Sequence, residues 1–149
     1  MIEVREVGWA HPDSERLRGQ QQAEIAERYG IPDSEPGPKP SAGDITVFYV
    51  AYDGDEAVGC GGLRQLDDSH GEIKRMFVLP AHRGSGVSTA ILDRLESEGR
   101  ARGWDRLVLE TGTEQPDAVR FYEREGYHPI PAFGYYVDSQ LSLCYEKAL

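Results

Sequence analysis

The stretch LPAHRGSGVS, residues 79–88, follows a hydrophobic segment and leads into an amphipathic pattern that begins near Gly86. It holds one arginine, two glycines and two serines, so its backbone has few side chains to cover it. Glycines at a strand-to-helix turn let backbone N–H groups face outward. The first N–H groups of a helix lack partners and lie at the positive end of its dipole. The stretch therefore predicts an anion site, usually occupied by a phosphate, although glycine can also serve the geometry of such a turn alone.

Two common phosphate-binding motifs do not fit this stretch. A mononucleotide-binding loop needs Gly-Lys-Ser/Thr, and the stretch contains no lysine. The dinucleotide fingerprint needs a third glycine where Thr89 stands, and its strand normally opens the chain rather than following three others. Arg83 can add a forked, charged donor at the edge of the turn. The ligand is therefore expected to be a phosphate compound of another kind.

The hydrophobic periodicity predicts an α+β fold in one domain, residues 1–149. An Asp-Gly turn between two apolar runs predicts a hairpin, and Gly61 and Gly62 predict a bulge or a close approach of another backbone in its second strand. The run 104–111 is almost continuously apolar, as in a strand buried on both faces. The expected sheet is mixed, antiparallel early in the chain, with a parallel crossover around the helix at 87–102. Strands are expected at 2–7, 45–52, 57–66, 72–80, 104–111, 127–130 and 141–149, and helices at 13–29, 87–102 and 115–126.

A second motif follows the buried strand, where residues 115–127 read QPDAVRFYEREGY. The chain here resembles the GCN5-related N-acetyltransferase family. Its members carry Gln/Arg-x-x-Gly-x-Gly/Ala at the start of the main helix and Asn-x-x-Ala-x-x-(aromatic or Leu)-Tyr-x-x-x-Gly-(aromatic) in the next one. Residues 83–88 match the first pattern except for Ser88, and Gln115 stands at the position of the usual Asn in the second. The resemblance spans residues 44–131 and implies the family's fold, a mostly antiparallel sheet flanked by helices and parted where acetyl-CoA binds.

The resemblance implies acetyl-CoA as the cosubstrate. No metal is expected, because the four histidines are scattered along the chain. Backbone N–H groups of residues 76–78 would meet the thioester oxygen, and the pantetheine arm would pair with this backbone almost as an extra strand. The glycine-rich turn would hold the pyrophosphate. The implied cofactor-binding residues are Met76, Phe77, Val78, Arg83, Gly84, Ser85, Gly86, Val87, Ser88, Gln115, Ala118 and Phe121.

The implied reaction is transfer of an acetyl group from acetyl-CoA to an amine, and it needs a base and an acid. Tyr122 matches the family's helix tyrosine and would donate a proton to the departing CoA thiolate. The alternative is a tyrosine that packs its ring and bonds a backbone carbonyl. Family members often use a glutamate on the strand before the glycine-rich turn at 84–88. Glu72 would therefore be the base, unless it is merely solvated at a strand end. Glu110, at the end of the buried strand, is the second candidate for the base.

The amine is expected to bind among three segments: the helix at 13–29, the loop at 31–44 and an aromatic loop near the C-terminus. Four prolines predict that 31–44 is an exposed loop, either mobile or folded over the site as a lid. Phe133, Tyr135 and Tyr136 of the aromatic loop either cage an ammonium or cover the end of the sheet. A small-molecule amine is the favoured acceptor. Transfer to a protein or peptide amine, and a non-catalytic acyl-CoA-binding domain, are the alternatives.

The formal charge of −10 argues against nucleic acid as a partner, because phosphate backbones need clustered Lys and Arg. The acidic surface either steers cationic amines or serves solubility. No apolar run approaches the roughly 18 residues that span a bilayer, and no signal peptide is found, so no membrane is expected. Cys60 and Cys144 lack metal or redox spacing, which predicts reduced thiols in the cytoplasm. The last strand, 141–149, is expected to be exposed and able to pair with a second copy as a homodimer.

Overall fold

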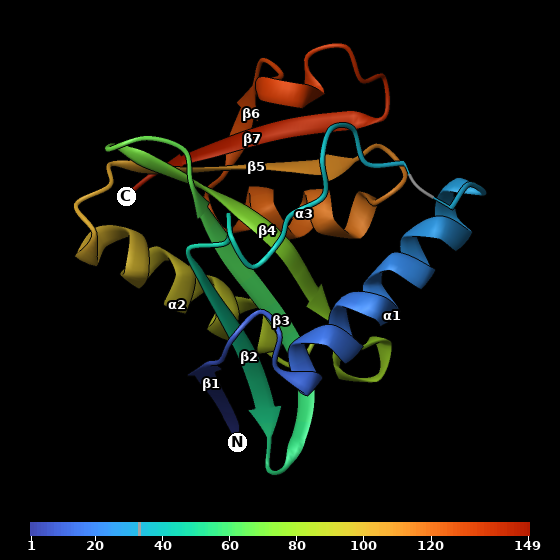
Figure 1. Cartoon of the computed structure of the whole chain (residues 1–149), viewed down its shortest axis with the longest axis vertical. Coiled ribbons are helices and arrows are strands. Elements are labelled where there is room, and N and C mark those ends of the chain that lie inside the picture. Colours follow the sequence, from blue (N-terminus) through green and yellow to red (C-terminus); the bar gives the residue numbers. More distant parts are fainter. Residues whose placement is uncertain (33) are drawn as a thin grey trace.

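The computed structural model describes residues 1–32 and 34–149, and Asp33 of the proline-rich loop lies outside the described residues. The chain forms one seven-stranded sheet with helices on both faces (Figure 1). The strands are β1 (Ile2–Glu6), β2 (Val47–Asp53), β3 (Glu56–Gln65), β4 (His70–Val78), β5 (Arg106–Gly112), β6 (His128–Ile130) and β7 (Ser142–Ala148). The helices are α1 (Pro12–Tyr29), α2 (Val87–Ala101) and α3 (Pro116–Arg124), with short 3₁₀ turns η1 (Pro80–His82) and η2 (Gly134–Tyr136). The predicted α+β fold with a mixed, mostly antiparallel sheet is confirmed.

The strands lie in the order β1-β2-β3-β4-β5-β7-β6. Among the described residues, neighbouring strands run antiparallel except for β4 and β5, which α2 connects as parallel neighbours. Their pairing ends at Ile73 and Leu109, although β4 continues to Val78 and β5 to Gly112. The two strands therefore part beyond this last pair, at the parallel crossover that the sequence predicted.

A β-bulge lies in β4 just beyond the point where the two strands part. The register of β3 against β4 shifts between Cys60 and Gly62, where Arg75 and Met76 together oppose one residue of β3. Arg75 has a φ of 59°, a left-handed conformation that is uncommon for a residue with a side chain. A bulge bends its strand and increases the local twist, which favours the separation of β4 from β5. Of the two alternatives predicted for Gly61 and Gly62, the close approach of another backbone is met, since a Cβ on Gly62 would lie 3.0 Å from the Val47 carbonyl oxygen. The extra residue of this bulge lies in β4, opposite Gly61, and not in the glycine-bearing β3.

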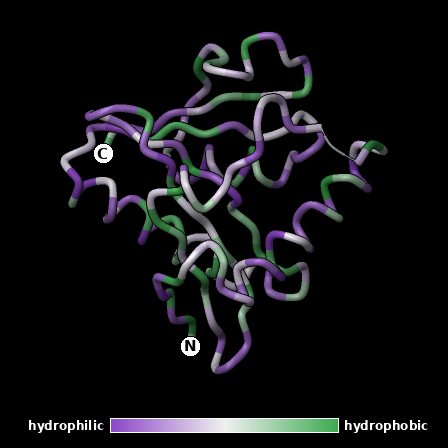
Figure 2. The backbone as a smooth tube through the Cα atoms, in the orientation of Figure 1, coloured by the Kyte–Doolittle hydropathy of each residue, from purple (hydrophilic) through white to green (hydrophobic). Residues whose placement is uncertain are grey.

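Two hydrophobic cores cover the two faces of the sheet. The larger core lies under α2 and α3 and contains Ile91 and Leu95, both fully buried. The smaller core lies under α1 and is built around Leu17, Phe48 and Phe77. Figure 2 shows α1 as alternating hydrophilic and hydrophobic segments, as expected for a helix with one buried side. The sheet thus lies between α1 on one face and the α2–α3 pair on the other.

The last strand is not an exposed edge. β7 pairs with β5 on one side and with β6 on the other, so the edge is formed by β6, which is three residues long and contains Pro129. The expectation that the final strand is free to pair with a second copy is therefore wrong, because neighbouring strands flank it on both sides. Among the residues that the structure describes, no helix is long and apolar enough to cross a membrane.

Gly71 of β4 packs against the ring of Trp104, and a Cβ at this position would lie 2.3 Å from that ring. We expect Gly71→Ala to lower the free energy of unfolding by about 1–3 kcal/mol, because overpacking forces side-chain and backbone shifts. Gly19→Ala on α1 is the matched control. Nothing lies within 4 Å of its Cβ position, so this change should raise the free energy of unfolding by up to about 1 kcal/mol. Urea unfolding followed by circular dichroism measures both variants, and unchanged stability of Gly71→Ala would contradict the tight packing.

Candidate active site

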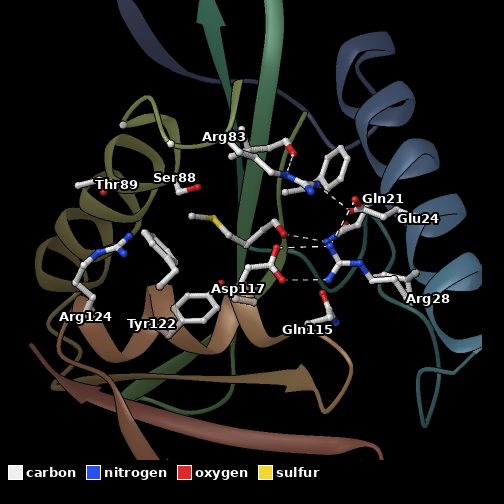
Figure 3. A pocket seen from close by; sticks show the side chains of 18 residues that line it. Gln21, Glu24, Arg28, Arg83, Ser88, Thr89, Gln115, Asp117, Tyr122 and Arg124 are labelled. Carbon is white, nitrogen blue, oxygen red and sulfur yellow. Dashed lines mark hydrogen bonds and ion pairs between the residues drawn. The ribbon is translucent and has the colours of Figure 1, made fainter. Parts of the chain in front are cut away.

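A cavity of about 360 Å³ lies beside the parted end of β4. It is enclosed by α1, the last residues of β4, the turn before α2 and one side of α3 (Figure 3). The lining residues foreseen from the sequence are Met76, Phe77, Val78, Arg83, Gly84, Gly86, Ser88, Gln115, Ala118, Phe121 and Tyr122. The lining residues that sequence reasoning missed are Gln21, Glu24, Ile25, Arg28, Thr89, Asp117 and Arg124. One cavity thus brings together most of the implied cofactor site and the candidate acid.

The turn between β4 and α2 opens its backbone towards this cavity. Gly84 and Gly86 have φ angles of 78° and 89°, which glycine adopts without strain, and nothing lies within 4 Å of either Cβ position. Gly86 is the N-cap of α2, whose first ladder bond runs from the Ala90 N–H to the Gly86 carbonyl. The N–H groups of residues 87–89 precede that bond and have no place in the ladder. The turn therefore has the geometry of an anion cradle.

Two residues implied for cofactor binding do not line the cavity. Ser85 donates its hydroxyl hydrogen to the His82 carbonyl, and Val87 is buried in the core under α2. Each residue therefore has only backbone atoms to offer a ligand in the cradle.

A chain of ion pairs runs from the cradle through α1 to α3 (Figure 3). Arg83 donates to the Val78 carbonyl and to Glu24, with 2.9 Å between nitrogen and oxygen in each bond. Glu24 lies 3.7 Å from Arg28, one turn later on α1, and Arg28 donates to Asp117 of α3 at 3.2 Å. The hydrogen bond from Arg28 holds the pKa of Asp117 below its ordinary value. Glu24 and Arg28 are four residues apart on α1, a spacing that is visible in the sequence. The sequence held no signal for the pairs of Arg83 with Glu24 and of Arg28 with Asp117, because these partners meet only in the folded chain.

Gln21 connects α1 to the bulge of β4. Its Nε2 donates to the Met76 carbonyl at 2.9 Å, while its Oε1 is buried with no hydrogen-bond partner among the described residues. The side chain lines the cavity, so this oxygen is an acceptor that a ligand in the cavity could engage. The available signal in the sequence is a run of three glutamines at 20–22 in the middle of an otherwise amphipathic helix.

Tyr122 of α3 lines the cavity, and 6% of its surface is exposed. Its ring packs edge-on against Phe121 and Tyr127, with centroids 5.2 and 5.6 Å apart. In the part of the chain that the structure describes, its hydroxyl has no hydrogen-bond partner, so the alternative of a bond to a backbone carbonyl is not met. Burial raises the pKa of this phenol above its ordinary value. Tyr122 is therefore a neutral donor at neutral pH.

A second cavity of about 50 Å³ adjoins the first, and the two share Ile25 and Gln115. Its walls come from α1, the loop that follows it, the bulge of β4 and the end of β5. Two of the three segments expected around an acceptor, α1 and the loop at 31–44, contribute to it, and the aromatic loop does not. The lining residues are Gln22, Ile25, Tyr29, Pro32, Ser34, Glu35, Arg75, Glu110, Gly112, Gln115 and Leu141.

The loop at 31–44 is folded against the body of the protein. Its Glu35 forms ion pairs with Arg75 at 3.1 Å and with Lys74 at 3.6 Å. Gly37 packs so closely on Tyr135 that a Cβ would lie 2.4 Å from that ring. Among the described residues of this loop, these contacts favour the lid over the mobile alternative.

Glu110 is the candidate base that lines the second cavity. Its Oε2 accepts a hydrogen bond from the Ser142 hydroxyl at 2.7 Å. Burial raises the pKa of Glu110, and the hydrogen bond from Ser142 opposes this in part. A carboxylate with a raised pKa takes up a proton more readily than an exposed one.

Glu72, the first candidate for the base, is 3% exposed and lines neither of these two cavities. Its Oε2 accepts a hydrogen bond from the Tyr136 hydroxyl at 2.7 Å and lies 3.6 Å from the Lys74 ammonium. Its Oε1 lies 3.7 Å from Arg64. Glu72 is therefore not a solvated strand-end charge but a member of a buried polar network.

The aromatic loop packs on the protein itself. Tyr136 is buried, accepts a hydrogen bond from Lys74 at 2.9 Å and meets the Phe133 ring edge-on at 5.2 Å. Tyr135 is 64% exposed and covers Gly37. These contacts favour a cover over the end of the sheet rather than a cage for a substrate ammonium.

The fold and the cavity define the class of protein. The model of the Acetyltransferase (GNAT) family matches residues 14–127, so the chain belongs to that family. It is 40% identical over 103 residues to an IAA acetyltransferase of Azospirillum brasilense, covering 68% of this chain and 67% of that one. It is 42% identical over 90 residues to an aminoalkylphosphonate N-acetyltransferase of Salmonella typhimurium, covering 56% and 58%. A solved structure, a putative acyl-CoA N-acyltransferase from Klebsiella pneumoniae, matches with a TM-score of 0.86 and 28% identity over 100% of this chain and 98% of that one.

The protein is therefore an N-acetyltransferase that depends on acetyl-CoA. Within residues 1–32 and 34–149, no group of three or more His, Cys, Asp or Glu side chains is placed to hold a metal ion. Cys60 and Cys144 are buried and form no disulfide. The protein groups at this site are hydroxyls, carboxylates, guanidinium groups and backbone N–H groups.

Alanine substitutions of Gly86 and of Ser88 should affect acetyl-CoA affinity differently. Gly86→Ala should weaken acetyl-CoA binding roughly tenfold, because a left-handed conformation costs a residue with a side chain about 1–2 kcal/mol and the turn would relax away from it. Ser88→Ala should bind acetyl-CoA at least as tightly as wild type, because Ser88 lines the cavity where the family pattern has Gly or Ala. Isothermal titration of both variants with acetyl-CoA measures this, and equal affinities for the two would contradict a cradle made of backbone.

Proposed function

We propose that this enzyme acetylates a primary amine of a small molecule, with acetyl-CoA as the donor. The observation that carries the proposal is a single cavity that holds both the glycine cradle and the unpartnered hydroxyl of Tyr122. The cradle suits a pyrophosphate, and a buried phenol suits a leaving thiolate. Pyrophosphate and thiol are the two chemically distinctive parts of coenzyme A.

The lining of the cavity gives each part of acetyl-CoA a place. The pyrophosphate lies against backbone N–H groups of residues 84–88, with Arg83 beside it. The pantetheine arm follows the backbone of residues 76–78, and the thioester reaches the gap where β4 and β5 part. The side chains that face the arm from α3 and its N-cap are Gln115, Ala118 and Phe121.

The chemistry then has three demands. A primary amine with a pKa of about 10.4 is protonated at neutral pH, so a carboxylate, Glu72 or Glu110, must accept a proton before the amine attacks. The oxygen of the tetrahedral intermediate meets backbone N–H groups of the parted end of β4. The CoA thiolate takes the hydroxyl proton of Tyr122. Burial raises the pKa of this phenol, so the phenol is protonated at neutral pH. Glu110, the backbone of residues 76–78 and Tyr122, which line the two cavities, are candidates for the three demands, with Glu72 as the other candidate base.

A small acceptor is favoured by the second cavity. It holds about 50 Å³ and has walls on several sides, whereas a protein or peptide amine needs a wide, shallow groove. The similarity to a protein named as an aminoalkylphosphonate N-acetyltransferase points the same way. A peptide acceptor is the second candidate, and a non-catalytic acyl-CoA-binding domain is the third.

Tyr122→Phe tests the acid directly. The ring keeps its packing and only the hydroxyl is lost, so kcat should fall by about 10²–10⁴-fold, the usual contribution of a general acid, with acetyl-CoA affinity unchanged. Tyr127→Phe is the matched control, since its hydroxyl donates to Glu96 and does not line the cavity. CoA release followed with a thiol reagent measures both. Near-normal turnover of Tyr122→Phe would remove this residue from the mechanism.

An acceptor screen that follows free CoA tests the function itself. The panel contains spermidine, glycine and other amino acids, 2-aminoethylphosphonate, kanamycin and peptides with free N-termini. We expect CoA release above the hydrolysis background with at least one small amine. Release with peptides alone would support the second candidate, and tight acetyl-CoA binding without release for any amine would support the non-catalytic domain.

The ion pair between Arg83 and Glu24 has a consequence for cofactor affinity. Both side chains are about one-third exposed and line the cavity, so a pyrophosphate in the cradle competes with Glu24 for the guanidinium. Glu24→Gln should therefore tighten acetyl-CoA binding by up to about fivefold, matching an exposed pair worth up to about 1 kcal/mol. Isothermal titration at low and high salt measures the gain, which should shrink as salt screens the charges. Weaker binding by this variant would indicate that Glu24 instead holds Arg83 in place for the phosphate.

A further inference from the structure

The carboxylates near the parting of β4 and β5 differ in what they can still bind. Glu72 has both oxygens occupied, Oε2 by the Tyr136 hydroxyl and Lys74 and Oε1 by Arg64. It is buried and contributes to neither of the two cavities. A general base must come within hydrogen-bond reach of the proton it takes, directly or through one water. Neither of the two cavities therefore gives an amine access to Glu72.

Glu110, unlike Glu72, has a carboxylate oxygen without a hydrogen-bond partner among the described residues and lines a cavity. It is the first residue of β5 beyond Leu109, the last one paired with β4. Only its Oε2 is engaged, by Ser142, and its Oε1 has no hydrogen-bond partner among the described residues. Glu110 lines the second cavity, which shares Gln115 and Ile25 with the cofactor cavity. An amine held in that cavity lies between this carboxylate and the cofactor cavity.

Glu110 and Tyr122 also lie on opposite sides of the sheet. Leu109 and Tyr122 belong to the core under α2 and α3, and alternation along a strand turns the next residue, Glu110, to the other face. That face carries the loop after α1, whose Glu35 lines the same cavity as Glu110. The first cavity is lined by residues of both α1 and α3, which lie on opposite faces, and it shares Ile25 and Gln115 with the cavity of Glu110. The amine therefore reaches the thioester from the face of Glu110, and the thiolate leaves towards Tyr122.

We propose that Glu110 is the general base of acetyl transfer and that Glu72 is a positioning residue that holds Lys74 and Tyr136; this rests on the proposed function. Glu110 takes one proton from the substrate ammonium and releases it to solvent. The nitrogen lone pair then forms the N–C bond to the thioester carbon, and its extra proton passes to Glu110. Collapse of the intermediate breaks the C–S bond, and sulfur takes the Tyr122 proton. The proton on Glu110 restores Tyr122 through solvent, so the sum is amide, free CoA and one released proton.

The charges around Glu110 fix the sign of the pH dependence. Burial raises the pKa of its carboxyl, the Ser142 hydrogen bond and the Lys74 ammonium lower it, and nearby carboxylates raise it. Since the base works only when ionised, kcat/KM should fall as pH drops through this raised pKa. The titratable and charged groups that face Glu110 or share its cavity are Glu72, Lys74 and Arg75 on β4, Glu35 on the loop, Tyr29 on α1, Tyr136 on η2 and Cys144 on β7.

The test compares Glu110→Gln with Glu72→Gln in the full chain. With the amine of the panel above that gives the fastest CoA release, Glu110→Gln should lower kcat by about 10²–10⁴-fold. It should also abolish the acidic limb that the Glu110 carboxyl sets in the kcat/KM profile, leaving only the rise towards the pKa of the amine itself. Its acetyl-CoA affinity by isothermal titration should stay within about twofold of wild type, since Glu110 does not line the cofactor cavity. Glu72→Gln should keep the acidic limb, whatever it does to stability, and Glu110→Asp should restore part of the rate and the limb.

Three results would overturn the inference. The limb set by the carboxyl can persist in Glu110→Gln, it can vanish in Glu72→Gln instead, or Glu110→Gln can turn over normally. Failure of the proposed function is a different result, in which the wild-type protein binds acetyl-CoA but releases CoA with no amine, and both proposals then fall together. A variant that binds acetyl-CoA with wild-type affinity is folded at the cofactor site, so a lost limb reports on the base rather than on unfolding.

Discussion

The parting of β4 and β5 beyond Ile73 and Leu109 is the constraint on which the rest of the site depends. Where two strands separate, backbone groups that would pair across the sheet need other partners, because an unpaired buried polar group costs about 1–3 kcal/mol. The chain supplies these partners from outside the sheet. Gln21 donates to the Met76 carbonyl and Arg83 donates to the Val78 carbonyl, both at 2.9 Å. Two side chains thus occupy positions that a neighbouring strand, or an extended ligand that imitates one, would take.

The same two side chains connect the parted strand to α1, which explains why α1 forms a wall of both cavities. Gln21 lies on α1 itself, and Arg83 is held to α1 through Glu24. Arg28 continues this contact to Asp117 on α3. Partly exposed ion pairs contribute at most about 1 kcal/mol each, so they hold the helix across the opening without locking it. A ligand that offers a phosphate and an extended backbone-like arm can replace these contacts at little cost.

The sequence was sufficient wherever the determining interaction is local. The glycine turn and the hairpin follow from residues near one another in the chain, and the structure agrees with them. The place of β7 inside the sheet was missed because it depends on β6, a strand of three residues that pairs only in the folded chain. The orientation of Ser85 towards the His82 carbonyl, away from the cavity, also escaped the motif. A motif specifies residue types and spacing, whereas orientation depends on the packing of the whole turn.

Glu72 forms an ion pair with Lys74, so its presence on β4 does not by itself identify it as the general base. The Lys74 ammonium is 6% exposed, and a buried charge without compensation is costly. Glu72 and Glu35, each 3.6 Å from the ammonium, supply the opposite charge, and the Tyr136 hydroxyl bonds both Lys74 and Glu72. The network therefore holds the Glu72 carboxylate in place between Lys74, Tyr136 and Arg64. Among the described residues, Glu110 has no ion-pair partner within 4 Å, and one of its carboxylate oxygens has no hydrogen-bond partner. It can therefore change its protonation state without breaking an ion pair in the core.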